Sequence, residues 1–310
     1  MKHETSKKVD SLHNLKSGFS NENGVIKIDG DRLTKLKNVL LEILRDFINV
    51  AEKYSLQYTL SGGSVLGAIR HHGFIPWDDD IDINIPRKDF NKFADVFENE
   101  LGDKYRLYSS CEKNGHGLTL VQMKKKGTIY RSFNELSKDK SNCGICLDMF
   151  VVENTFDNVL ARNIHGIFCL ALGYLSTCRK TYEDMPYLIS YIEKGSAAEN
   201  TFKKKACVGG IFRWLSLDWI IKTTVRCYSL CGNDNSKYVT IPTGRKHYFG
   251  EMHSRADLCE AIETSFEGMA VKIPKGYDAY LTALYGEDYM ALPPVEERES
   301  HPLMEIDFGQ

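Results

Sequence analysis

"GGSVLGAIRHHGFIPWDDDIDINIP", residues 62 to 86 of this 310-residue chain, decides what kind of fold to expect. Two glycines predict a turn before the short helical stretch VLGAIRHH, with Ser64 as its N-cap and Gly73 as the residue that ends it. After the bend FIPW, the segment DIDINI alternates with a period of two, so its isoleucines share one face and Asp80 and Asp82 share the other. The stretch therefore predicts a glycine turn, a helix and an acidic strand in succession, preceded by a strand over QYTL.

The acidic strand raises a question of charge. Carboxylates two residues apart on a strand point the same way and repel each other at neutral pH unless a cation lies between them. A second strand, ICLDMFVV, alternates in the same manner and places Asp148 opposite its apolar face. Three carboxylates from two strands suit Mg²⁺ or Mn²⁺, hard cations that stabilise phosphoryl transfer. With backbone N–H groups from the glycine turn, the residues predict a metal-dependent phosphate-transfer site.

The same residues allow other interpretations. The spacing of Asp78, Asp80 and Asp82 matches the opening of an EF-hand loop, but Ile83 takes the place of the obligatory glycine and Asp89 that of the final glutamate. A solvated acidic loop is the other alternative, and the apolar alternation favours a strand over it. Cys143 and Cys146 form a single C-x-x-C without a second pair, so structural thiols are expected rather than a metal site.

Composition limits the class of protein. The chain is 42% hydrophobic with a formal net charge of −2, which indicates a globular protein and gives no sign of a nucleic-acid partner. The odd number of cysteines, nine, favours a reducing compartment, and hence a cytoplasmic location. Four segments are predicted: a polar leader (1–30), a catalytic core (31–155), a helical insert (156–240) and a C-terminal segment (241–310).

The helical insert has two interpretations. Its aromatic and aliphatic segments with basic neighbours suit either amphipathic helices lying on a membrane surface or a cap whose apolar residues are buried against the core. We expect the cap, because buried helices of this length are common in soluble domains. No apolar run reaches the roughly 18 residues of a membrane span, so no crossing is expected.

The stretch LSGGSVLGAIRHHGFIPWDDDIDINIPRKDF resembles the signature of the LicD family, a branch of the polymerase-beta-type nucleotidyltransferase superfold that includes the fukutin-like enzymes. LDMFVVE and the segment from FEGMAVKIP to ERESH are similar to further parts of that family. The resemblance covers about residues 33 to 155 and 240 to 301. It implies an α+β fold: a polymerase-beta-like core with a small mixed sheet flanked by helices, a helical insert, and a C-terminal segment that closes the cleft.

The resemblance also implies an activity. A phospho-alcohol such as phosphocholine or ribitol phosphate would move from a CDP-activated donor to a hydroxyl of a cell-surface glycan or lipid-linked oligosaccharide, releasing CMP. Such an enzyme would be cytoplasmic, with a peripheral contact at the inner face of the membrane as an option. Nucleotidyl transfer from an NTP, with release of pyrophosphate, is the alternative, and a non-catalytic Ca²⁺-binding protein is disfavoured.

Site residues follow position by position from the resemblance. Asp80 and Asp82 match its metal-binding DxD, Asp148 matches the third carboxylate, and Asp78 supports the metal site. The residues expected to bind the donor or its phosphates are Gly62, Gly63, Ser64, Arg298 and His301.

Three further residues have two interpretations each. Arg70 and His71 either neutralise charge on the leaving group or form a surface pair at a helix end. Trp77 either stacks on cytosine or an acceptor sugar, or fills the core.

Overall fold

The computed structural model describes residues 26, 28–110, 117–132, 135–295, 298 and 303–309. The predicted polar leader, residues 1–30, falls almost entirely outside these residues, and His301 falls outside them as well.

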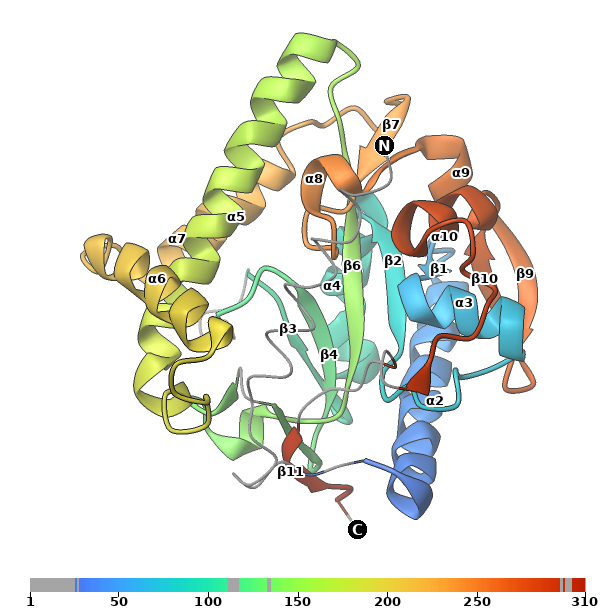
Figure 1. The fold of residues 1–310 in the computed structure, drawn as a ribbon. Coiled ribbons are helices and arrows are strands. Elements are labelled where there is room, and N and C mark those ends of the chain that lie inside the picture. Colours follow the sequence, from blue (N-terminus) through green and yellow to red (C-terminus); the bar gives the residue numbers. More distant parts are fainter. Residues whose placement is uncertain are drawn as a thin grey trace.

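A mixed sheet forms the centre of the molecule (Figure 1). Its strands follow the order β1–β2–β6–β4–β3, and β7 pairs with both β6 and β8. Only the β2–β6 pairing is parallel, and the other pairings in this sheet are antiparallel. The strands are β1 (Thr59–Leu60), β2 (Asp82–Pro86), β3 (Tyr105–Tyr108), β4 (Val121–Lys125), β6 (Cys146–Asn154), β7 (Tyr238–Thr240) and β8 (Met252–Ser254). This mixed α/β architecture is compatible with the predicted α+β class.

Two long helices, α2 (Gly30–Lys53) and α4 (Arg87–Leu101), pack together beside the sheet. Apolar residues recur along α2 at helical spacing, and Phe47 of α2 meets Phe93 of α4 edge to face, with ring centroids 5.3 Å apart. The isoleucines predicted to share one face of the acidic strand are fully buried in this core. Because side chains alternate along a strand, that burial directs Asp82 to the opposite face.

The glycine turn opens α3 (Gly62–His71), but its caps differ from the prediction. Ser61, not Ser64, occupies the N-cap position, and Ser64 lies inside the helix with its hydroxyl turned to the acidic strand. At the other end His72 takes the left-handed conformation (φ 55°) that was expected at Gly73. The physical reason is that the helix begins at Gly62 itself, whose φ of +47° a glycine adopts without steric cost.

The helical insert consists of α5 (Val159–Leu188), α6 (Ala197–Ile211) and α7 (Leu217–Tyr228) and forms one flank of the molecule (Figure 1). Ser176 of α5 and Thr224 of α7 are joined by a 2.8 Å hydrogen bond, and Gly209 lets α6 approach the backbone of α5 at Cys178. Burial in the insert is uneven, so the expected cap stays a prediction. Cys169 and Tyr228 are buried, whereas Trp214 is 75% exposed and Trp219 53%.

The rest of the chain forms short elements. The chain continues through α8 (His247–Gly250), α9 (Arg255–Cys259), the hairpin β9 (Ala261–Phe266) and β10 (Met269–Pro274), α10 (Tyr277–Tyr285) and β11 (Leu303–Asp307). A 3-10 turn at Lys140–Asn142 precedes β6, and β11 returns to pair with β5 (Ile129–Ser132). Of these elements, β9 and α10 contact α3, so the C-terminal segment lies beside the glycine turn.

Candidate active site

The parallel pairing of β2 and β6 brings together the two strands that carry the acidic residues. In its register, Asp82 lies directly opposite Asp148. Both side chains are partly exposed, whereas their neighbours Ile83, Leu147 and Met149 are fully buried on the other face. Two carboxylates from distant parts of the chain thus point to the same side of the sheet, as the alternation of each strand predicts.

The glycine turn lies against the same corner of the sheet. Gly62 donates its N–H to the hydroxyl of Tyr280 (3.1 Å), and Asp82 donates its N–H to the hydroxyl of Ser64 (3.0 Å). A methyl group added to Gly62 would lie 3.8 Å from Asp82 Oδ2, and one added to Gly63 would lie 3.1 Å from Asp78 Oδ2. The first turn of α3 therefore borders the carboxylates without intervening side-chain bulk.

Three consecutive aspartates precede β2 and form a compact group. One carboxylate oxygen from each of Asp78, Asp79 and Asp80 lies within 4.8 Å of the others. Asp79 was not predicted as a site residue; it is buried and accepts a hydrogen bond from the hydroxyl of Tyr130 at 3.1 Å. The only signal in the sequence was its place in the DDD run, because the strand alternation begins one residue later.

The electrostatics of the corner are dominated by repulsion. Desolvation raises the pKa of Asp82 well above its usual value, and the neighbouring Asp80, Asp148, Asp78 and Asp79 raise it further. A divalent cation would stabilise this corner strongly, because it removes the repulsion between ionised carboxylates. The carboxylate oxygens of Asp80, Asp82 and Asp148 are of the kind that binds Mg²⁺ or Mn²⁺. The metal assignment therefore stays a prediction with which the residues present are consistent.

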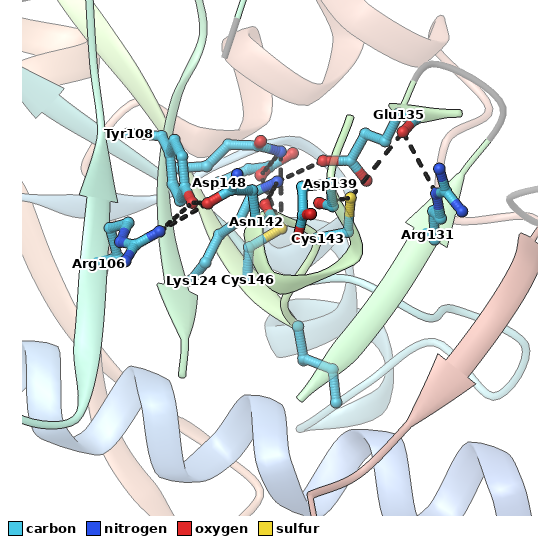
Figure 2. Close-up of polar contacts among 12 residues, drawn as sticks. Arg106, Tyr108, Lys124, Arg131, Glu135, Asp139, Asn142, Cys143, Cys146 and Asp148 are labelled. Atoms are coloured by element: carbon cyan, nitrogen blue, oxygen red, sulfur yellow. Dashed lines mark hydrogen bonds and ion pairs between the residues drawn. The ribbon is translucent and has the colours of Figure 1, made fainter. Parts of the chain in front are cut away.

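Asp148 is oriented by residues of its own sheet. Gln122, its partner in the β4–β6 register, donates to Asp148 Oδ1 at 2.9 Å, and the thiol of Cys146 donates to the same oxygen at 3.3 Å. Figure 2 shows Asp148 and Cys146 beside a buried ion pair between Lys124 and Glu135.

The two cysteines of the C-x-x-C belong to this network but have different partners. The Cys143 thiol lies 3.4 Å from the carbonyl oxygen of Asp139, whereas the Cys146 thiol faces Asp148. Burial and the Asp148 carboxylate raise the pKa of Cys146 well above its usual value, so it remains a thiol. Both thiols therefore have oxygen partners in this network, and the expected structural role stays a prediction.

Arg70 and His71 lie at the C-terminal end of α3. The Arg70 guanidinium donates to the carbonyl oxygens of Tyr289 (2.9 Å) and Ala291 (3.0 Å), and its Nε donates to His71 Nε2 (3.0 Å). Desolvation and the adjacent Arg70 charge lower the pKa of His71, which favours the neutral imidazole that accepts this bond. Arg70 thus holds the C-terminal segment against α3, and its predicted role toward a phosphate stays a prediction.

Trp77 packs as a core residue, and its predicted stacking on cytosine or an acceptor sugar stays a prediction. Its ring packs against the hydrophobic core, and the guanidinium of Arg298 lies over it, 4.1 Å from the ring centroid. Arg298 Nε is buried without a hydrogen-bond partner among the described residues. The C-terminal signature therefore meets the acidic bend through this stacked pair.

Two residues near the glycine turn were not found from the sequence. The Tyr285 hydroxyl lies next to Gly62 and Gly63, and desolvation together with Tyr280 and Asp82 raises its pKa well above the usual value. The positive charge of Arg245, an exposed residue in the segment IPTGRKHY, acts on Tyr285 in the opposite direction. The pattern Gly-Arg-Lys after a turn was a weak signal that could have directed attention to Arg245.

The chain is similar in sequence to several known proteins. Residues 55–160 match the family described as "LicD/FKTN/FKRP, nucleotidyltransferase domain", a range that contains the glycine turn and all the aspartates discussed above. The chain is 28% identical over 282 residues to the lipopolysaccharide cholinephosphotransferase LicD of Haemophilus influenzae, covering 86% of this chain and 94% of that protein. Over 50 residues it is 46% identical to the ribitol 5-phosphate transferase FKRP of Homo sapiens, covering 16% of this chain and 10% of that protein.

The site therefore lies in a nucleotidyltransferase-type domain of the LicD/FKTN/FKRP class. The chain is similar to LicD over most of its length and to the fukutin-related FKRP over a shorter stretch, as its signature stretch predicted.

Proposed function

We propose that this chain is a LicD-type phosphotransferase that moves a phospho-alcohol from a CDP-activated donor to a hydroxyl of a glycan and releases CMP. The observation that carries the proposal is the parallel register of β2 and β6, which sets Asp82 opposite Asp148 beside the first turn of α3. The similarity to a cholinephosphotransferase over most of the chain supports the reaction class. We infer a polymerase-beta-like core from the same arrangement.

The reaction assigns a role to each part of the site. The acceptor oxygen attacks the phosphorus that carries the alcohol, and the bond from that phosphorus to the bridging oxygen breaks, so that CMP leaves with the electron pair. Asp148 accepts the proton of the acceptor hydroxyl, in an orientation set by Gln122. The first turn of α3 borders the carboxylates, and its N-terminal end would bind donor phosphate.

The metal completes the proposal. Asp80 and Asp82 would hold Mg²⁺ or Mn²⁺ together with Asp148, and the cation supplies charge stabilisation for the pyrophosphate. Arg298, which stacks over Trp77, would bind the donor through its guanidinium. These assignments suit either phosphocholine or ribitol phosphate as the transferred group.

Calorimetry with defined nucleotides tests the proposal. CDP-choline, CDP-ribitol, CDP-glycerol and CTP are titrated into the protein with Mg²⁺, with Mn²⁺ and with neither. We expect metal-dependent binding of one CDP-alcohol well above CTP, and loss of that binding in Asp82→Asn. Tighter binding of CTP, with pyrophosphate as the product, would replace the proposal with nucleotidyl transfer.

A further inference from the structure

The outer face of the helical insert exposes an unusual amount of apolar surface. Of the 22 large apolar side chains that are exposed among the described residues, 14 lie between Val159 and Leu230. Along α5, Leu160, Ile164, Ile167 and Phe168 are between 48% and 69% exposed and recur at helical spacing. A continuous apolar face of this kind on a folded protein indicates an interaction surface.

The charge of the insert differs from that of the rest of the chain. Residues 156–231 contain ten Lys and Arg against six Asp and Glu, whereas the whole chain has 40 against 42. Among these basic residues, Lys203, Lys204, Arg213 and Arg226 are exposed. The insert therefore combines exposed apolar side chains with net positive charge on an otherwise slightly acidic protein, a combination that complements an anionic lipid surface.

Helix α5 is long and apolar enough to cross a membrane by length and composition, contrary to the expectation from the sequence. The length of its uncharged stretch and its contacts with the rest of the protein favour a position on the membrane surface instead. Its stretch without charged residues, 163–178, spans only about 24 Å, short of the roughly 30 Å of a bilayer core. On the side of α5 that faces the protein, His165 shares a hydrogen bond with the hydroxyl of Tyr248. Further along the helix, Lys180 forms a buried ion pair with Asp184.

The insert also exposes two tryptophans. Trp214 lies between α6 and α7, and Trp219 lies in the first turn of α7. A hydrogen bond from Arg179 of α5 to the carbonyl oxygen of Leu215 shows that this segment lies near the C-terminal half of α5. Tryptophan side chains partition into the headgroup region of membranes, where the ring is buried and the N–H meets water.

We propose that the exposed apolar face of α5, defined by Leu160, Ile164, Ile167 and Phe168, binds the protein to the surface of an anionic lipid bilayer. The inference goes beyond the phosphotransferase proposal and is independent of it, since lipid binding is measured with neither donor nor acceptor present. Failure of one proposal leaves the other in place.

Co-sedimentation with vesicles tests the inference. The intact protein is mixed with vesicles of phosphatidylcholine alone or of phosphatidylcholine with phosphatidylglycerol. We expect binding to the anionic vesicles at least about tenfold stronger, and a fall of about tenfold or more in the double variant Ile167→Asp with Phe168→Asp. Arg213→Gln with Arg226→Gln is expected to lower binding to anionic vesicles by about fivefold per charge while leaving the neutral vesicles unaffected.

Matched controls separate lipid contact from general effects. Asn91→Asp with Ala94→Asp adds the same two negative charges to an exposed part of α4 and is expected to bind vesicles like the unmodified protein. Ile167→Ser with Phe168→Ser removes the apolar contact without adding charge, and circular dichroism checks the fold of each variant. Absence of binding to anionic vesicles, or unchanged binding in both folded α5 variants, would overturn the inference. The inference would also be overturned if the unmodified protein formed a dimer, did not bind vesicles, and dissociated in these variants. A second copy of the chain would then cover the face.

Discussion

At the scale of single residues, Asp82 experiences the combined repulsion of Asp78, Asp79, Asp80 and Asp148. Asp82→Asn keeps the size of the side chain and removes one charge, so it should abolish transfer without lowering thermal stability in the absence of metal. CMP release and thermal unfolding are the two measurements, and Asp95→Asn on the exposed side of α4 is the matched control. Substantial transfer by a folded Asp82→Asn protein would show that the metal assignment is incorrect.

Glu251 is a second residue whose environment predicts a measurable effect. It is 3% exposed, accepts the N–H of Lys246 at 2.9 Å, and burial raises its pKa from 4.5 to about 7. Because the folded state prefers the protonated carboxyl, this group's contribution to stability is complete below about pH 4.5 and is lost as the pH rises through 7. The loss amounts to about 3 kcal/mol.

Urea unfolding at about pH 5 and about pH 8 compares the protein with Glu251→Gln, whose amide does not titrate in this range. We expect the free energy of unfolding of the unmodified protein to fall between these pH values relative to that of the variant. An equal difference between the two proteins at both pH values would contradict the raised pKa.

At the scale of elements, the start of α3 depends on two glycines. Gly62→Ala places a β-carbon on a residue with φ +47°, 3.4 Å from the Tyr285 hydroxyl. The left-handed conformation costs about 1–2 kcal/mol for a non-glycine residue. We expect a comparable loss of stability and a larger loss of donor binding, measured by calorimetry. Gly232→Ala, where a β-carbon meets nothing within 4 Å and φ is not positive, should leave donor binding unchanged.

The ion pair of Lys124 and Glu135 joins β4 to the segment that precedes β6, next to Asp148 (Figure 2). Both side chains are at most 9% exposed, so Lys124→Met would leave a buried carboxylate without its partner and should cost about 3–5 kcal/mol. The double variant Lys124→Met with Glu135→Leu should recover most of that loss. Chemical denaturation of the single and double variants measures this difference, and additive losses would contradict a coupled pair.

At the scale of the whole molecule, the sequence predicted local features better than long-range ones. Strand alternation was sufficient to assign Asp82 and Asp148 to polar faces, but their pairing depends on which strands become neighbours. Arg70 meets Tyr289 across 219 residues, a contact that no local pattern encodes. The helical character of the insert was likewise visible in its sequence. The sequence could not show that the side of α5 with Ile167 and Phe168 lacks a covering element among the described residues.

The tether from Arg70 to the C-terminal segment leads to a last prediction. Arg70→Met removes the donors to the carbonyl oxygens of Tyr289 and Ala291, so the segment after α10 should open more often and be cleaved about tenfold faster by a protease. Arg70→Lys can bond only one of these carbonyl oxygens well, so its cleavage rate should lie between those of the unmodified protein and Arg70→Met. Limited proteolysis followed by mass spectrometry locates the cuts, and calorimetry measures donor affinity on the same samples. If Arg70→Met weakened donor binding while cleavage stayed unchanged, the guanidinium would act on phosphate, as the sequence suggested, and its contacts with the segment would be secondary.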